Sequence, residues 1–99
     1  MTSKKIDLSV VIVNHNGLRY LEKCLASIEL NCAGLSYEVV FVDNKSNDSS
    51  VAFVSSHYPW VKVIESHENL GFAKGNNLGV ANSAGENILL LNNDTVLIN

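Results

Sequence analysis

Four short apolar runs, separated by segments with helical spacing, constrain the fold of this chain more than any other feature. The first two runs are rich in β-branched residues and almost continuously apolar, which is typical of strands covered on both faces of a sheet. The third run alternates apolar and polar residues, so we expect a shorter strand near a sheet edge. The four predicted strands cover residues 7–14, 37–42, 60–65 and 87–91.

Each segment between two of these runs has the features expected of a helix. From Leu18 the apolar positions recur every three or four residues, which predicts a first helix. The second helix follows the turn-forming segment DNKSNDSS, in which Asp48 or Ser49 can cap it, and Pro59 ends it. The three predicted helices cover about 18–31, 49–57 and 71–83.

The resulting order is β-α-β-α-β-α-β with short connections. This order predicts an α/β fold with an open, mainly parallel sheet and helices on both faces. A chain of 99 residues has room for one core, and no linker or internal repeat divides it. We therefore expect a single domain over residues 1–99.

Charge and hydropathy exclude several classes of function. The net charge of −3 and the scattered basic residues argue against nucleic acid as a partner. No apolar run approaches the roughly 20 residues that span a bilayer, and no signal-peptide cleavage site follows the first run. A cytoplasmic protein is expected, with peripheral attachment to the membrane left open.

Two cysteines, Cys24 and Cys32, fall in or near the first predicted helix. Eight helical residues rise about 12 Å, which exceeds the roughly 7 Å limit between the Cα atoms of a disulfide. We therefore expect two reduced thiols that fill part of the core.

Polar residues follow three of the four apolar runs. In a parallel sheet they lie on one rim, at the carboxyl ends of the strands, where open α/β folds bind ligands. The alternative is that these residues only form turns, since Asn and Asp are good turn formers. The three groups are Asn14, His15 and Asn16, then Asp43 and Asn44, then Asn92, Asn93 and Asp94.

No glycine-rich phosphate loop follows the first strand, because neither G-x-G-x-x-G nor G-x-x-x-x-G-K-[ST] occurs. A dinucleotide site or a P-loop is therefore not expected. A nucleotide can still be held at its base and ribose while a metal screens its phosphates. Asp94 suits a hard cation such as Mg²⁺ or Mn²⁺, which takes oxygen ligands.

Four motifs, VVIVNHNG, FVDNKSNDSS, ENLGFAKGNNLGV and ILLLNNDT, resemble those of the family 2 glycosyltransferases of the inverting GT-A type. The resemblance covers residues 7–97 and is greatest to the rhamnosyltransferase-like members, which act in cell-surface polysaccharide synthesis. It implies the Rossmann-like, nucleotide-binding half of a GT-A domain. The implied reaction moves a sugar, with inversion, from a dTDP-sugar or UDP-sugar to a glycan or lipid-linked acceptor.

The resemblance implies that the ends of the first two strands contact the donor nucleotide. Asn14, His15 and Asn16 stand where the common family form is Thr-Tyr-Asn, so the first two depart from it. Asp43 matches the acidic residue that contacts the base. The alternative for Asp43 is a turn or a helix cap.

The segment 68–79 resembles the family element N-x-G-x-x-x-x-x-N-x-G, which borders the diphosphate and the sugar. Asn69, Gly71 and Asn77 match it. Many members carry Arg where this chain has Asn76, so Lys74 is the nearest cation. Lys74 either faces the diphosphate or is a solvated helix residue.

LNNDT matches the D-x-D position of the family. Asp94 is therefore the implied ligand of Mg²⁺ or Mn²⁺, and Asn92 adds a neutral oxygen. The family places its general base after this region, so we expect no catalytic residue here and a fragment that is inactive alone. An exposed sheet edge after the fourth strand predicts a homodimer.

Other readings of the sequence are a non-catalytic binding or interaction module of the same fold, a nucleotidyltransferase, and a flavodoxin-like or receiver domain. A nucleotidyltransferase is disfavoured because NHNGLRYLEK is not a glycine-rich basic loop. A receiver is disfavoured because the acidic cluster near the first strand is absent.

Overall fold

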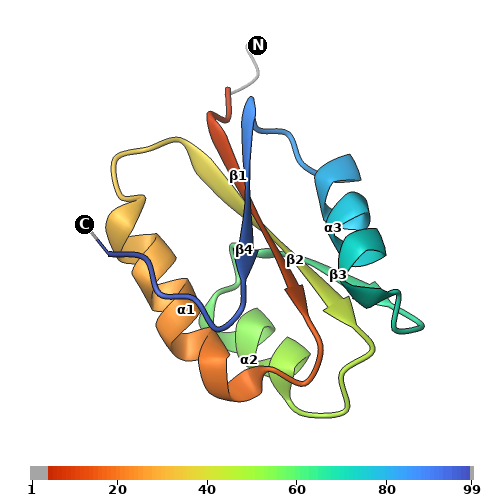
Figure 1. Ribbon diagram of the computed structural model, residues 1–99. Coiled ribbons are helices and arrows are strands. Elements are labelled where there is room, and N and C mark those ends of the chain that lie inside the picture. The colour runs from red at the N-terminus through yellow and green to blue at the C-terminus, as the bar shows by residue number, and fades with distance from the viewer. Residues whose placement is uncertain (1–4, 99) are drawn as a thin grey trace.

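The computed structural model describes residues 5–98, which form a four-stranded sheet with helices on both faces (Figure 1). The strand order is β3-β2-β1-β4, and every neighbouring pair is parallel. The predicted α/β fold is therefore confirmed. The elements are β1 (Leu8–Asn14), α1 (Leu18–Asn31), β2 (Tyr37–Asn44), α2 (Ser50–His57), β3 (Lys62–Ser66), α3 (Gly71–Ala81) and β4 (Asn87–Asn92).

The larger core lies between the sheet and the layer formed by α1 and α2 (Figure 1). Alternate residues of β1 and β2 point into it, and one stripe of α1 meets them. Because the other face of the same strands is also covered, β1 and β2 read as continuous apolar runs. The fully buried side chains of this core include Val10, Ile12, Leu21, Leu25, Ile28, Val39, Phe41 and Val54.

Helix α3 covers the opposite face of β1 and β2 and packs closely against it through two glycines. Gly75 and Gly79, one helical turn apart, face the sheet. A β-carbon on Gly75 would come 2.8 Å from Val13 Cγ1, and one on Gly79 would overlap Val11 Cγ1. Because glycine has no side chain, the backbone of α3 can lie close to the strands, and the start of α3 lies above the end of β2.

Strand β3 begins at Lys62, two residues later than predicted. The N–H of Val61 donates to the carbonyl of Tyr58 at 3.0 Å and closes a turn there. Trp60 packs edge-to-face on Tyr37, with ring centroids 5.8 Å apart. Tertiary packing therefore holds residue 60 outside the strand. The expectation that β3 lies at a sheet edge is confirmed.

Helix α3 ends at Ala81 and not at residue 83. The side chain of Asn82 donates to the carbonyl of Leu78 at 2.9 Å, and the hydroxyl of Ser83 donates to that of Gly79 at 2.8 Å. These bonds satisfy carbonyls that a longer helix would have paired with its own N–H groups. The side chains thus end the helix.

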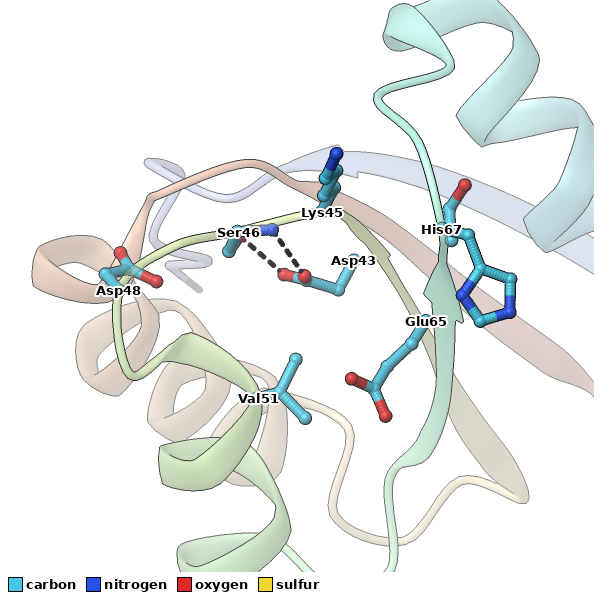
Figure 2. Close-up of a pocket in the computed structure, with 8 residues that line it drawn as sticks. Asp43, Lys45, Ser46, Asp48, Val51, Glu65 and His67 are labelled. Atoms are coloured by element: carbon cyan, nitrogen blue, oxygen red, sulfur yellow. Dashed lines mark hydrogen bonds between the residues drawn. The ribbon is translucent and has the colours of Figure 1, made fainter.

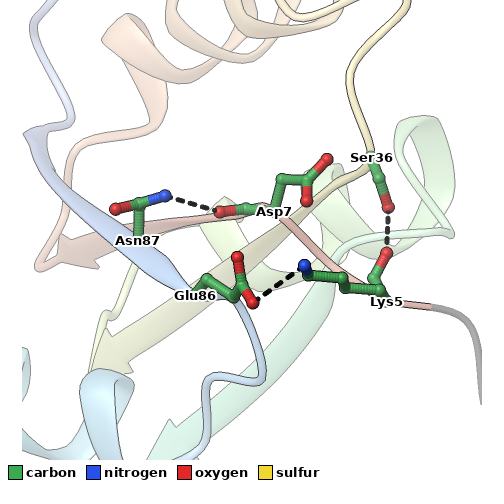
Figure 3. A network of polar contacts seen from close by, with 5 residues as sticks. All are labelled: Lys5, Asp7, Ser36, Glu86 and Asn87. Carbon is green, nitrogen blue, oxygen red and sulfur yellow. Dashed lines mark hydrogen bonds and ion pairs between the residues drawn. The ribbon is translucent and has the colours of Figure 1, made fainter.

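The amino-terminal end of the sheet is fastened by contacts between segments far apart in the sequence (Figure 3). Ser36 Oγ donates to the carbonyl of Lys5 at 2.6 Å, and Asn87 Nδ2 donates to the carbonyl of Asp7 at 3.3 Å. Lys5 and Glu86 form an ion pair of 3.0 Å. The exposed ion pair contributes little stability. The contact of Ser36 joins the start of β2 to the segment before β1, and those of Glu86 and Asn87 join the start of β4 to the same segment.

Cys24 and Cys32 are free and buried, as predicted. Burial, assisted by the nearby charge of Asp94, raises the pKa of Cys24 to about 11. Burial also raises the pKa of Cys32. Both thiols therefore stay protonated at neutral pH and act as small apolar core residues.

None of the helices between residues 5 and 98 has the length and apolar character needed to cross a membrane. The cytoplasmic location and peripheral attachment stay predictions, as does the single domain over 1–99, whose residues 1–4 and 99 lie outside the described part of the chain.

Candidate functional site at the carboxyl rim of the sheet

The carboxyl ends of β1, β2 and β4 lie side by side, so the polar residues that end these strands gather on one rim (Figure 1). Asn14 pairs in register with Asp43, and Val13 pairs with Asn92. Strand β2 runs two residues beyond its predicted end, through Asn44, and β4 runs one residue beyond its predicted end, through Asn92. The predicted gathering is therefore confirmed.

Asn14 joins three segments at the centre of this rim. Its side chain is fully buried. Nδ2 donates to Asp43 Oδ1 at 3.0 Å and to Ser46 Oγ at 3.2 Å, and Oδ1 accepts from Asn93 Nδ2 at 2.7 Å. The amide thus faces the protein and holds the strand ends together. Its contact with a nucleotide stays a prediction.

Asp43 is 3% exposed, and both of its carboxylate oxygens are hydrogen-bonded. Oδ1 also accepts from Ser46 Oγ at 2.7 Å, and Oδ2 accepts from the N–H of Ser46 at 2.9 Å. These bonds to the loop that follows β2 are local side-chain-to-backbone interactions of the kind that the sequence left open as an alternative for Asp43. Base contact by Asp43 stays a prediction.

His15 and Asn16 connect the loop after β1 to the loop after β2. His15 Nδ1 lies 2.6 Å from the carbonyl oxygen of Asn44, which requires a proton on Nδ1. Asn16 Oδ1 accepts from the N–H of Asn47 at 2.7 Å, and its own N–H donates to Ser46 Oγ at 2.8 Å. Both side chains are exposed. The two loops therefore form one unit.

Asp48 bridges the amino-terminal ends of α1 and α2. Oδ1 accepts from the N–H of Ser50 at 3.0 Å, and Oδ2 accepts from the N–H of Leu18 at 3.2 Å. Ser49 occupies the N-cap position of α2 but makes no side-chain capping bond, so the side chain of Asp48, one residue earlier, supplies this bond to the helix. Partial burial alone would raise the pKa of Asp48, but hydrogen bonds from Ser50 and Leu18 outweigh it and lower this pKa.

A pocket of about 480 Å³ opens beside this rim, between the ends of β2 and β3 and the start of α2 (Figure 2). Asp43 is the one predicted site residue that lines it. Reasoning from the sequence missed Glu65, although it ends the third apolar run and pairs in register with Asp43. The lining residues are Asp43, Lys45, Ser46, Asp48, Val51, Glu65, Ser66 and His67.

The loop before α3 is tied to the end of β2. Asn69 Oδ1 accepts from the N–H of Gly71 at 3.0 Å, and Asn44 Nδ2 donates to the carbonyl of Gly71 at 3.1 Å. Asn44 Oδ1 is buried and has no partner among the described residues. Lys74 and Asn77 are exposed on α3. The structure thus places this element beside the rim but outside the lining of the pocket.

Asn92 is the last residue of β4, and Asp94 lies in the turn that follows it, which the N–H of Thr95 closes on the carbonyl of Asn92 at 3.0 Å. Both side chains are exposed, and within residues 5–98 the carboxylate of Asp94 has no hydrogen bond or ion pair. No group of three or more His, Cys, Asp or Glu residues in this range could hold a metal. One carboxylate and one amide oxygen fit a cation shared with phosphate oxygens, as Mg²⁺ often is.

Beyond this turn the chain runs back along α1 (Figure 1). The N–H of Leu97 donates to Ser27 Oγ at 3.0 Å, and Asn31 Nδ2 donates to the carbonyl of Leu97 at 3.0 Å. The turn that carries Asp94 is therefore held on both sides, by β4 and by α1.

Several known proteins share this fold. S. aureus TarS, residues 1–349, superposes with a TM-score of 0.84 and 25% identity over 92% of this chain and 28% of that one. Its complex with UDP-GlcNAc gives a TM-score of 0.82 and 26% identity, over 90% of this chain and 27% of TarS. Mannosyltransferase PcManGT from Pyrobaculum calidifontis, in complex with GDP-Man and Mn²⁺, gives a TM-score of 0.80 over 95% of this chain and 29% of the PcManGT chain. Its sequence identity is 22%, so this likeness shows the fold alone.

The chain thus spans less than a third of each of these structures. A search of the curated proteins gave no significant match. The family model described as Glycosyl transferase family 2 matches residues 9–98, nearly the whole chain. The four motifs and the parallel sheet agree with this match, and the chain belongs to glycosyl transferase family 2.

Proposed function

We propose that this chain forms the donor-nucleotide site of an inverting glycosyltransferase. The observation that carries the proposal is that Asp43 and Asp94 lie on one rim of the sheet, at the ends of β2 and β4 with β1 between them. Two strand spacings amount to roughly 10 Å. A nucleoside diphosphate lying across the rim then has its base at the pocket beside Asp43 and its diphosphate at Asp94.

A divalent cation, Mg²⁺ or Mn²⁺, is part of this proposal. Asp94 and Asn92 would hold it together with the diphosphate, whose departure it would assist by neutralising charge. Lys74, exposed on α3, supplies a positive charge beside the same rim. With one carboxylate in the set, we expect the protein to bind the cation weakly unless a nucleotide is present.

A dTDP-sugar or UDP-sugar is the proposed donor. The resemblance of the four motifs to rhamnosyltransferase-like members favours it, and the TarS relative was crystallised with UDP and with UDP-GlcNAc. The proposed acceptor is a glycan or a lipid-linked sugar in cell-surface polysaccharide synthesis. We assign no general base among residues 5–98, and we propose that these 99 residues bind the donor without transferring its sugar.

Self-association through β4 is a further part of the proposal. β4 is an edge strand, and its Ile88 and Leu90 side chains are 39% and 51% exposed. It carries no charge or proline of the kind that protects sheet edges. Sedimentation should therefore detect a dimer that Leu90→Lys abolishes. A wild-type monomer at high concentration would contradict this part alone.

The donor site can be tested by thermal shift with UDP, dTDP, GDP and CDP, each with and without Mn²⁺. A ligand that binds only the folded state at one hundred times its Kd stabilises it by about 2.7 kcal/mol. We expect a shift that depends on the base and on Mn²⁺, is lost in Asp94→Ala and persists in Asp7→Ala, an exposed aspartate at the opposite end of the sheet. Absence of any shift would favour the non-catalytic binding module.

A further inference from the structure

Glu65 and Asp43 present two carboxylates to the same pocket. They are register partners in β3 and β2, and partners in neighbouring strands point to the same face of a sheet. Both line the pocket of about 480 Å³, and Figure 2 shows the carboxylate of Glu65 directed into the space between Asp43 and Val51. A ligand in this pocket therefore meets Glu65 as well as Asp43.

The two carboxylates differ in the hydrogen bonds that they already accept from the protein. Asp43 is 3% exposed and accepts hydrogen bonds from Asn14 and Ser46. Glu65 is exposed, and no hydrogen bond or ion pair to its carboxylate occurs in the part of the chain that the structure describes. Asp43 is thus largely committed to the fold, while both oxygens of Glu65 are available to a ligand.

The strand order indicates which part of a nucleotide reaches Glu65. β3 and β4 are the opposite edges of the sheet, so Glu65 and Asp94 are separated by three strand spacings, roughly 14 Å. With the diphosphate at Asp94, the group farthest along the rim is the nucleobase. A carboxylate repels phosphate and accepts hydrogen bonds from N–H groups, so it suits the base and not the diphosphate.

We propose that Glu65 is a specificity-determining residue of the donor site and accepts a hydrogen bond from the ring N–H of the nucleobase. Uracil, thymine and guanine carry such an N–H on the edge that faces away from the ribose. Neutral cytosine and adenine do not. The pocket therefore selects nucleotides of the first group. This inference rests on the proposed function, because it takes the ligand to be a nucleoside diphosphate.

Isothermal titration calorimetry with UDP, dTDP, GDP, CDP and ADP, in the presence of Mn²⁺, tests the assignment. The variants are Glu65→Gln and, as a matched loss of one negative charge, Glu22→Gln on the exposed side of α1. A charge-assisted hydrogen bond is about twice as strong as a neutral one, so Glu65→Gln should weaken UDP binding about tenfold and leave CDP binding nearly unchanged. If Glu65 did not contact the nucleotide, removal of its negative charge would strengthen the binding of the negatively charged nucleotide instead.

Each other outcome overturns the assignment in a recognisable way. If the wild type binds UDP and Glu65→Gln has the same ratio of UDP affinity to CDP affinity, the role of Glu65 is contradicted while the proposed donor site stands. An equal loss for all five nucleotides contradicts base selection. Wild-type protein that binds none of them contradicts the proposed function, and the assignment falls with it. Because Glu65 is exposed and its carboxylate has no partner within residues 5–98, the ligand-free melting temperature should not change, which separates these results from misfolding.

Discussion

Asn14 Nδ2 donates a hydrogen bond of 3.0 Å to Asp43 Oδ1 and so joins the last residue of β1 to the end of β2. Both side chains are buried, at 0% and 3% exposure. Water cannot take the place of either side chain at this buried position. A buried polar atom that loses its partner therefore pays the full free energy of its lost hydration. The polar rim is therefore part of the fold as well as of the candidate site.

Replacement of Asn14 by alanine should lower the free energy of unfolding by about 1–3 kcal/mol, because it removes the hydrogen-bond acceptor of Asn93 Nδ2 and one of the hydrogen bonds that the buried carboxylate of Asp43 accepts. Urea unfolding measures the loss. Asn47→Ala is the control, since Asn47 is exposed and its side chain makes no hydrogen bond within residues 5–98; we expect a change below about 0.5 kcal/mol. Equal stability of the two variants would contradict the structural role of Asn14.

Asp48 should make stability depend on pH in the acid range. Its folded pKa lies below the usual value of 3.8, so its contribution is complete above that value and is lost as the pH falls through the folded pKa. We expect Asp48→Ala to cost about 1 kcal/mol at pH 7, the usual value of a helix cap, and less at pH 3. Urea unfolding at both pH values measures this. Asp48→Asn keeps a capping oxygen and has no carboxylate to titrate, so its loss relative to wild type should be smaller than that of Asp48→Ala at pH 7 and should also shrink at pH 3.

The cysteines should be unreactive in the folded protein. Thiolate is the reactive form, and burial raises the pKa of Cys24 to about 11 and that of Cys32 in the same direction. A thiol reagent at pH 8 should label both only after addition of denaturant. The contribution of Cys24 to stability is complete below its unfolded pKa of 9.0 and falls as the pH rises toward 11. Rapid labelling of folded protein would show that the core beside α1 opens.

The sheet could be predicted because local pattern and tertiary burial agree in it. The runs of β1 and β2 are apolar since both faces are covered, and the polar rim follows from parallel strands. The start of β3 was missed because a non-local contact sets it, since Trp60 leaves the strand to pack on Tyr37. The end of α3 was missed because the side chains of Asn82 and Ser83 bond to carbonyls four residues earlier. Such contacts leave no periodic signal in the sequence.

The location of the candidate site could be predicted from the sequence, but the contacts of its residues could not. Turn chemistry placed Asn14 and Asp43 on the rim, but the sequence does not indicate that Asn14 is buried or that Asp43 already accepts several hydrogen bonds. Glu65 was missed because it is one more polar residue of an alternating strand. Its register with Asp43, known only from the sheet, distinguishes it.

Gly17 provides the most direct test of how the rim is packed. A β-carbon there would overlap Asn93 Nδ2 and lie 2.5 Å from Asn14 Oδ1, the two atoms of one partly buried hydrogen bond. Its φ is −101°, which alanine adopts without strain, so any loss of stability in Gly17→Ala comes from these contacts. Overpacking of this kind should cost about 1–3 kcal/mol in urea unfolding.

A double-mutant cycle identifies the source of that loss. Asn93→Ala removes the atom with which the new β-carbon overlaps, so Gly17→Ala should cost at least about 0.5 kcal/mol less in that background than in wild type. A remaining cost is expected from the approach to Asn14. If the two substitutions were additive, Asn93 would not lie against Gly17, and the hydrogen bond from Asn93 to Asn14 would not be the link between β1 and the turn that carries Asp94.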